Sequence, residues 1–162
     1  MSKRDTWLTC DESLLVVRLD FHKGAGNGGQ KINKTSSAVR ITHPESGITT
    51  VCNESRSQTR NRQLAIRKLR KRMALELRCE PEMEVNAKDI PALTNERYYL
   101  YLAQVLDHLQ KTGSVPGFTR SGLERFLRRD PEVWRYLSEH KTTEYGIYFG
   151  VRTCSGDGAP VP

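Results

Sequence analysis

Apolar and polar residues alternate over residues 14–21, which predicts a strand with one buried face. Two shorter runs, residues 39–42 and 48–52, predict two further strands, and the HPESG sequence between them is rich in turn-forming residues. From residue 57 to about residue 78 the apolar residues recur with helical spacing. The first half of the chain therefore predicts a small sheet and one long helix.

The long helix is expected to begin after Ser57, whose hydroxyl suits the N-cap position. Its expected buried stripe comprises Ala65, Leu69, Met73 and Leu77, flanked by Leu64 and Ile66. The remaining surface carries eight basic residues, namely Arg60, Arg62, Arg67, Lys68, Arg70, Lys71, Arg72 and Arg78. Glu76 is the single acidic residue of this helix, whereas a surface kept for solubility alone tolerates glutamate as readily as arginine. A phosphate-backbone partner explains the pattern better than solvation does.

The second half of the chain predicts more helix than strand. Residues 80–94 contain two prolines and three glutamates, which is typical of a connector. Residues 96–111 have helical spacing, with Tyr98, Leu102, Val105, Leu106 and Leu109 facing inward, and Gly113 ends that pattern. Residues 145–151 predict a last strand, and the tail after it is expected to be disordered.

Two short helices are predicted from their starting residues. Ser121 with Glu124 matches a capping box, in which each residue satisfies a backbone N–H of the first turn. Asp130-Pro131 matches an N-cap followed by proline at the first helical position. We therefore expect one helix to start at each of these two sites.

The expected fold class is α+β: a small sheet with a glycine-rich loop and one long basic helix, followed by a mostly helical C-terminal extension. We expect an N-terminal domain over residues 1–79, a connector over 80–94, a helical unit over 95–152 and a disordered tail over 153–162. A chain of 162 residues and 18.5 kDa is large enough for one such domain with an appendage.

The composition predicts a water-soluble protein, with 36% hydrophobic residues, a mean hydropathy of −0.63 and no stretch long enough to span a membrane. The start lacks the apolar core of a secretory signal, and Asp5, Asp11 and Glu12 argue against a transit peptide. We therefore expect a cytoplasmic protein, bacterial rather than organellar.

The net charge of +7 is unevenly distributed. Residues 1–80 carry 16 basic and 8 acidic side chains, whereas residues 81–162 carry 10 basic and 11 acidic ones. The excess positive charge of the first half favours a polyanion as its partner. The four cysteines and four histidines are dispersed without close pairs, so we expect no metal site and no disulfide framework.

A glycine-rich segment follows the first predicted strand, and its GAGNGG sequence, residues 24–29, matches GxGxxG. A dinucleotide-binding loop must open a helix, but here strand-like alternation follows within about ten residues. A phosphate-binding P-loop needs lysine directly after the last glycine, where this chain has Gln30. Both nucleotide-binding interpretations therefore fail.

Gly28-Gly29-Gln30 lies within KGAGNGGQKINKTSSAVRITHPESGI, and SRSQTRNRQLAIRKLR follows. This ordered series, from about residue 12 to residue 78, closely resembles the catalytic domain of class I peptide-chain release factors. The resemblance implies that the chain promotes hydrolysis of the ester between peptide and tRNA in the peptidyl-transferase centre of the ribosome. It implies no metal or organic cofactor.

The resemblance implies that Gly28, Gly29 and Gln30 form the catalytic tip, because glycines allow a close approach in a crowded site. The backbone N–H of Gln30 would stabilise developing charge or the leaving 3′ hydroxyl, while its side chain restricts the site to water. In the family this glutamine is often methylated, so Gln30 is a candidate substrate of a glutamine methyltransferase. The expected RNA-binding residues are Lys31, Lys34, Arg40, Arg56, Arg60, Arg62, Arg67, Lys68 and Lys71, with a solvated side chain as the alternative for each.

The chain departs from full release factors, which carry separate domains that read stop codons. It is more similar to the short, codon-independent relatives that release peptides from stalled ribosomes or obstructed large subunits. Those relatives often end in a tail rich in lysine and arginine, whereas residues 95–152 predict folded helices. We therefore expect that unit to recognise a different ribosomal surface, the tRNA, a protein partner or the catalytic domain itself. Its candidate RNA contacts are Arg125, Arg128 and Arg129, with solvent-facing side chains on a packing helix as the alternative.

The predicted partners are large-subunit ribosomal RNA and peptidyl-tRNA, and the protein is expected to be a monomer. The alternative function is a non-catalytic ribosome- or RNA-binding factor that retains the release-factor fold. Fold resemblance alone does not separate the two. The intact GGQ sequence favours hydrolysis.

Overall fold

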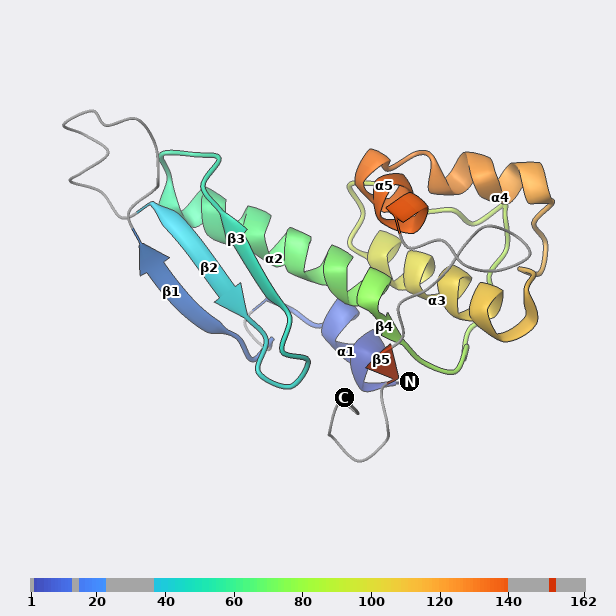
Figure 1. Cartoon of the computed structure of the whole chain (residues 1–162), viewed down its shortest axis with the longest axis horizontal. Coiled ribbons are helices and arrows are strands. Elements are labelled where there is room, and N and C mark those ends of the chain that lie inside the picture. The colour runs from blue at the N-terminus through green and yellow to red at the C-terminus, as the bar shows by residue number, and fades with distance from the viewer. Residues whose placement is uncertain (1, 13–14, 23–36, 140–151, 154–162) are drawn as a thin grey trace. The chain divides into compact units, whose positions relative to one another are not determined.

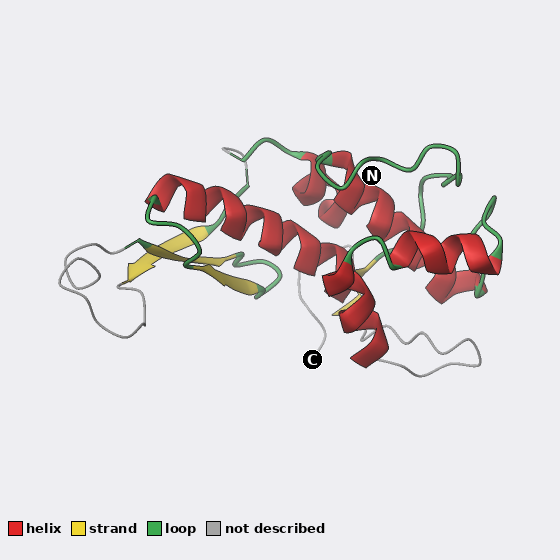
Figure 2. Cartoon of the chain, turned by 90° about the horizontal axis from the view of Figure 1, so that it is seen from above, coloured by secondary structure: helices red, strands yellow, loops and turns green. Residues whose placement is uncertain are grey.

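The computed structural model describes residues 2–12, 15–22, 37–139 and 152–153. The chain divides into two compact units, Cys10–Arg72 and a second one formed by Met1–Thr9 together with Met73–Pro162 (Figure 1). Strands and one long helix make up the first, and helices dominate the second, so the fold is α+β as predicted (Figure 2). None of the described helices combines the length and the apolar character needed to cross a bilayer.

The unit Cys10–Arg72 contains a three-stranded antiparallel sheet in the order β1-β2-β3. The strands are β1 (Arg18–His22), β2 (Ala38–Thr42) and β3 (Thr49–Cys52). Helix α2 (Gln58–Glu76) lies along one face of this sheet (Figures 1 and 2). The buried apolar residues between them are Val39, Ile41, Cys52, Ala65, Ile66 and Leu69. The helix thus covers the face that the strands leave apolar.

The predicted β2–β3 hairpin is confirmed: both strands end where predicted, and each begins one residue from its predicted start. His43 donates its N–H to the carbonyl of Ile48 at 2.9 Å and accepts from the N–H of Gly47 at 2.9 Å. Gly47 has φ = 67°, a conformation that other residues rarely adopt. Strand β1 begins four residues later than predicted, at Arg18, because its partner β2 ends at Thr42 and the turn begins there.

The N-cap of α2 is confirmed: Ser57 accepts from the N–H of Arg60 at 3.4 Å through its hydroxyl and from that of Asn61 at 3.0 Å through its carbonyl. The helix ends at Glu76, two residues before the predicted end. Residues Leu77–Arg78 instead form β4, which pairs in parallel with β5 (Arg152–Thr153).

Arg78 was predicted on the basic surface of the helix, and that prediction is wrong. Only 2% of this residue is exposed, and its guanidinium donates to the carbonyls of Ala74, Leu75 and Leu77. Ala74 and Leu75 lie in the last turn of α2, whose carbonyls have no N–H partner within the helix, so the cation caps the end of α2. Burial lowers the pKa of Arg78 to about 10.

The helical unit is built from α1 (Lys3–Thr9), α3 (Arg97–Thr112), α4 (Arg120–Leu127) and α5 (Pro131–Glu139). Its buried residues include Leu8, Tyr98, Leu102, Val105, Leu106, Phe126, Leu127, Val133 and Leu137. Gly113 ends α3 with φ = 69°, as its sequence position predicts. The predicted strand over 145–151 and the residues from 154 onward lie outside the described residues.

One of the two predicted caps in this unit is confirmed and the other is wrong. Asp130 caps α5 by accepting from the N–H groups of Glu132 at 3.0 Å and Val133 at 3.5 Å. Helix α4, however, is capped by Thr119, whose hydroxyl accepts from the N–H of Gly122 at 3.1 Å. Thr119 is extended, with ψ = 157°, and the helix begins at the next residue, so Ser121 already lies inside α4.

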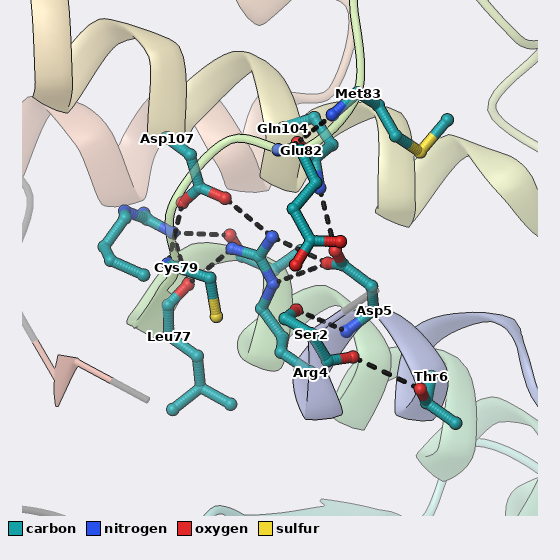
Figure 3. Close-up of polar contacts among 12 residues, drawn as sticks. Ser2, Arg4, Asp5, Thr6, Leu77, Cys79, Glu82, Met83, Gln104 and Asp107 are labelled. Carbon is teal, nitrogen blue, oxygen red and sulfur yellow. Dashed lines mark hydrogen bonds and ion pairs between the residues drawn. The ribbon is translucent and has the colours of Figure 1, made fainter. Parts of the chain in front are cut away.

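Helix α1 was not predicted, and it carries a buried arginine (Figure 3). The guanidinium of Arg4 lies 2.6 Å from a carboxylate oxygen of Asp107 and 2.7 Å from one of Asp5, and it donates to the carbonyl of Leu77 at 3.2 Å. Gln104 donates to the second oxygen of Asp5 at 2.9 Å. The side chains of α1 and α3 are thereby joined in one buried polar network.

Burial sets the ionisation of this network. Burial raises the pKa of Asp107 above its ordinary value, although the hydrogen bond and charge of Arg4 act in the opposite direction. Burial by itself would lower the pKa of Arg4, but the hydrogen bond and charge of Asp107 raise it above its ordinary value. Each group therefore favours the charged form of the other, against the cost of burying both.

Replacing Asp107 with asparagine keeps the side-chain shape but removes the charge opposite Arg4. We expect Asp107→Asn to lower the free energy of unfolding by about 3 kcal/mol, because a buried cation loses one of its two carboxylates. Chemical denaturation measures the change. Glu124→Gln is the control, since it removes an exposed partner of Arg128 and is expected to cost about 0.5 kcal/mol. Equal effects of the two variants would contradict the argument.

His43 gives the hairpin a pH dependence. This residue is 1% exposed, and its Nδ1 accepts from the N–H of Ser46 at 3.2 Å. Burial lowers the pKa of His43 from its ordinary value of 6.5, so below that pH the unfolded chain binds the proton more readily than the folded one. We expect stability to fall as the pH drops below about 6.5, and His43→Gln to reduce that fall.

The measurement is thermal unfolding of wild type and His43→Gln at pH 7.5 and 5.5. Groups other than His43 titrate in both proteins, so the difference between the two pH slopes isolates this histidine. Identical slopes would show that His43 does not couple folding to protonation.

Candidate nucleic-acid interface

The predicted catalytic residues Gly28, Gly29 and Gln30, with Lys31 and Lys34, lie outside the described residues. The structure does describe the strands on either side of that segment. His22, at the end of β1, pairs with Ala38, at the start of β2. The chain therefore leaves the sheet and re-enters it at neighbouring register positions.

The re-entry point is held by a buried asparagine in the first turn of α2. Asn61 is fully buried, and its amide nitrogen donates to the carbonyl of Ser37 at 2.7 Å and to that of Ser55 at 2.7 Å. Its amide oxygen accepts from the N–H of Ser55 at 2.8 Å and contacts the thiol of Cys52 at 3.8 Å. One side chain thus links β2, β3 and α2 at the end of the sheet nearest to the GGQ sequence along the chain.

Sequence reasoning used Asn61 only as part of a motif and assigned it no role. A signal was present, because asparagine is a poor helix interior residue and this one lies among arginines near a predicted helix start. The carbonyl of Ser37, which it contacts, lies 24 positions earlier in the chain. That partner cannot be inferred from local spacing.

Three of the predicted RNA-binding residues share one face of α2. Arg60, Arg67 and Lys71 recur at spacings of seven and four residues, so they lie in one row along the helix. Arg60 and Arg67 are exposed and Lys71 is half-buried. We call these three residues the basic row.

Arg56 and Arg62 are exposed near the start of α2 but do not extend this row. Arg56 precedes the helix, and Arg62 follows Arg60 by two positions, which points it to a different side of the helix. Both can reach a phosphate near the helix N-terminus, where the unpaired backbone N–H groups also favour anions.

Arg40 lies away from the helix. Its neighbours Val39 and Ile41 are buried against α2, so the alternation of β2 directs Arg40 to the opposite face of the sheet. There it is paired in register with Asp20 of β1 and Val51 of β3. The structure therefore does not bring Arg40 together with the basic row.

Two cations on the β3 side of the helix contact the sheet region. Lys68 pairs with Glu54 at 2.5 Å, with both side chains partly exposed, and Arg72 donates to the carbonyl of Thr49 at 2.6 Å. An exposed ion pair contributes little to stability, so an anionic partner can displace Glu54 at small cost. Lys68 is thus compatible with its predicted role but is engaged within the protein.

Arg70 was also predicted on the surface of α2, and that prediction is wrong. It is 3% exposed, and its guanidinium donates to the carbonyl of Cys10 at 2.5 Å. Arg70 lies one turn after Ile66, on the side of the helix that faces the core. Helical spacing therefore indicated its burial, which the prediction from residue type overlooked. The contact ties the start of this unit to the helix.

The electrostatics of the unit nevertheless favour a polyanion. Residues 10–72 contain 13 basic and 5 acidic side chains. The exposed guanidinium groups offer planar donors that match phosphate oxygens. Among the described residues, histidine, cysteine and carboxylate side chains form no cluster suited to a metal ion. The described part of the site can therefore hold nucleic acid by charge.

Comparison with known proteins finds a match to the RF-1 domain over residues 11–103. Relatives include peptide chain release factor 2 of Thermomicrobium roseum, 42% identical over 130 residues, which cover 76% of this chain and 34% of that protein. Peptide chain release factor 2 of Treponema pallidum is 37% identical over 121 residues, covering 69% and 33%. The mouse protein named peptide chain release factor 1-like, mitochondrial, is 43% identical over 82 residues, covering 50% and 22%.

These matches span about a third or less of the relatives' own length. They nevertheless cover most of this chain for the two bacterial proteins, and the RF-1 domain takes up more than half of its residues. The GGQ sequence, the three-stranded sheet and the first turns of α3 all fall within residues 11–103. The chain belongs to the RF-1 domain family, which is the GGQ domain of class I release factors.

Proposed function

We propose that this protein hydrolyses the ester bond of peptidyl-tRNA in the peptidyl-transferase centre of the ribosome, without reading a stop codon. The observation that carries the proposal is the RF-1 domain match over residues 11–103, which includes Gly28, Gly29 and Gln30. The expected partners are therefore large-subunit RNA and peptidyl-tRNA.

The chemistry proposed for this site is positioning and hydrogen bonding. The backbone N–H of Gln30 donates to the oxygen on which charge develops, or to the leaving 3′ hydroxyl. Its side-chain amide orders the site around a water molecule, and the two glycines before it allow close approach to RNA. No covalent intermediate is needed, because water is the nucleophile.

In this proposal the basic surface of α2 binds the RNA. Arg60, Arg67 and Lys71 form the basic row, with Arg56 and Arg62 near the helix start. Phosphate contacts position a protein without reading sequence, which is what an enzyme that must act at one place in the ribosome requires.

Codon independence is proposed for the activity of these 162 residues. The described elements outside the RF-1 match are α1, α4, α5, β5 and the latter part of α3. These are short helices and a two-residue strand, and we assign them no codon-reading role. The substrate class that follows is peptidyl-tRNA in a ribosome stalled without a stop codon, or in an obstructed large subunit.

The role of the Gln30 backbone is tested by two substitutions at the same position. Gln30→Pro removes the backbone N–H, whereas Gln30→Ala keeps it and removes only the side-chain amide. We expect Gln30→Pro to lower the rate of peptide release by about 100-fold or more and Gln30→Ala to lower it less. Release of labelled peptide from ribosomes stalled on a truncated message measures both rates.

The same assay separates the competing functions. Binding to the ribosome is measured for each variant, and wild type is also assayed with a stop codon in place of the truncated end. Wild-type binding without release would indicate a non-catalytic factor, and faster release at the stop codon would contradict codon independence. Equal release by Gln30→Pro and Gln30→Ala would show that the backbone N–H is not the group that acts.

The basic row is tested by the salt dependence of ribosome binding. Replacing Arg60, Arg67 and Lys71 together with glutamine is expected to weaken binding by about 10-fold or more and to reduce the slope of log affinity against log salt by about 2 to 3. Arg18→Gln is the control, because Arg18 is exposed on β1 beside Asp20 and belongs to no proposed contact. An unchanged slope in the triple variant would place the RNA contact elsewhere.

A further inference from the structure

Asn61 contacts the backbone immediately before β2, the strand that follows the GGQ-bearing segment in the chain. We propose that Asn61 is a positioning residue for peptide release, which fixes to α2 the point, at Ser37, where the chain re-enters the sheet after Gly28, Gly29 and Gln30. The inference rests on the proposed hydrolytic function. The juxtaposition that carries it is the hydrogen bond from Asn61 of α2 to the carbonyl of Ser37, the residue immediately before β2.

The amide of Asn61 uses its hydrogen-bonding capacity fully. Both N–H groups of the side chain donate to backbone carbonyls at 2.7 Å, and the oxygen accepts from a backbone N–H at 2.8 Å. The residue is fully buried, so water cannot replace any of these bonds without rearrangement. Such a saturated site specifies one geometry of the three segments that meet there.

The contacts of Asn61 are not those of a helix cap. A capping asparagine satisfies an N–H of its own helix, but Ser57 already caps α2. The side chain of Asn61 instead points its donors at Ser37 and Ser55, which lie outside the helix on the two sides of the β2–β3 hairpin. The function of this amide is therefore to hold backbone that does not belong to α2.

Ser37, which Asn61 holds, lies directly after the segment that carries the GGQ sequence. Ser37 is the first described residue after segment 23–36, and Ala38 beside it pairs with His22, the last residue before that segment. Asn61 thus fixes the position at which the GGQ-bearing segment rejoins the sheet. Arg60, the adjacent residue, belongs to the basic row that grips RNA in the proposed function.

This arrangement predicts that loss of the Asn61 amide lowers the rate of peptide release but leaves ribosome binding almost unchanged. Removal of the amide leaves the basic row in place, so ribosome affinity is expected to change by less than about 3-fold. A shift of about 1 Å in the reacting groups can cost about 100-fold in rate, so the maximal rate of release is expected to fall by that order.

The test compares variants that lose one buried hydrogen-bonding side chain in the same unit. Asn61→Leu has nearly the same shape as asparagine and makes no hydrogen bond, and Asn61→Ser is the second variant if the leucine protein does not fold. Thr50→Val is the matched control, because the Thr50 hydroxyl, also buried, joins β3 to the middle of α2 by donating to the carbonyl of Ala65 at 3.0 Å. The full chain is assayed on ribosomes stalled on a truncated message, below the melting temperature of each variant.

The readouts are kcat and KM for peptide release, ribosome affinity and the melting temperature. A fall in kcat of about 100-fold for the Asn61 variants, with KM and affinity unchanged and Thr50→Val close to wild type at equal loss of stability, supports the proposal. An unchanged kcat, or equal losses in Asn61 and Thr50 variants, would overturn it. Absence of release by wild type would instead refute the proposed function, so the two failures are distinguishable.

Discussion

The helical unit depends on one buried ion pair, between Arg4 of α1 and Asp107 of α3. Neither charge is stable alone in that environment, because removing an ion from water costs several kcal/mol that only a well-placed partner offsets. Asp5 and the carbonyl of Leu77 complete the coordination of the guanidinium. Residues more than 100 positions apart are therefore obliged to fold together, and the unit Cys10–Arg72 is an insertion between two parts of this helical unit in the sequence.

In the unit Cys10–Arg72 a second buried polar group, the amide of Asn61, must likewise have its hydrogen-bond partners in place. Packing of Val39, Ile41 and Leu69 brings the sheet and α2 together, but apolar contact is non-directional and leaves the ends of the strands free to shift. A buried amide with all its bonds made tolerates no such shift. Apolar contacts thus stabilise this unit, and one polar side chain determines how β2 begins.

Local signals in the sequence predicted several of the elements whose physics is local, although the cap of α4 at Thr119 was missed. The β2–β3 hairpin, the caps at Ser57 and Asp130 and the end of α3 at Gly113 each depend on residues within a few positions. What could not be predicted depends on distant partners: the hydrogen bond of Arg70 to the carbonyl of Cys10, and the whole of α1, whose few apolar residues give no helical period. The candidate site divides likewise, since the basic row follows from helical spacing and the contact of Asn61 with Ser37 does not.

In the proposed function, α2 contacts RNA through fewer cations than its sequence predicts. Of the eight cations predicted on the surface of α2, Arg70 and Arg78 are buried, and Lys68 and Arg72 contact Glu54 and Thr49. The basic row, from Arg60 to Lys71, spans twelve residues, or about 16 Å at 1.5 Å per residue, which suits a few consecutive phosphates of one strand. A contact of that size positions the protein without selecting a sequence. In the proposed function, selectivity then depends on the geometry required at the reacting groups, and not on the contacts of α2 with RNA.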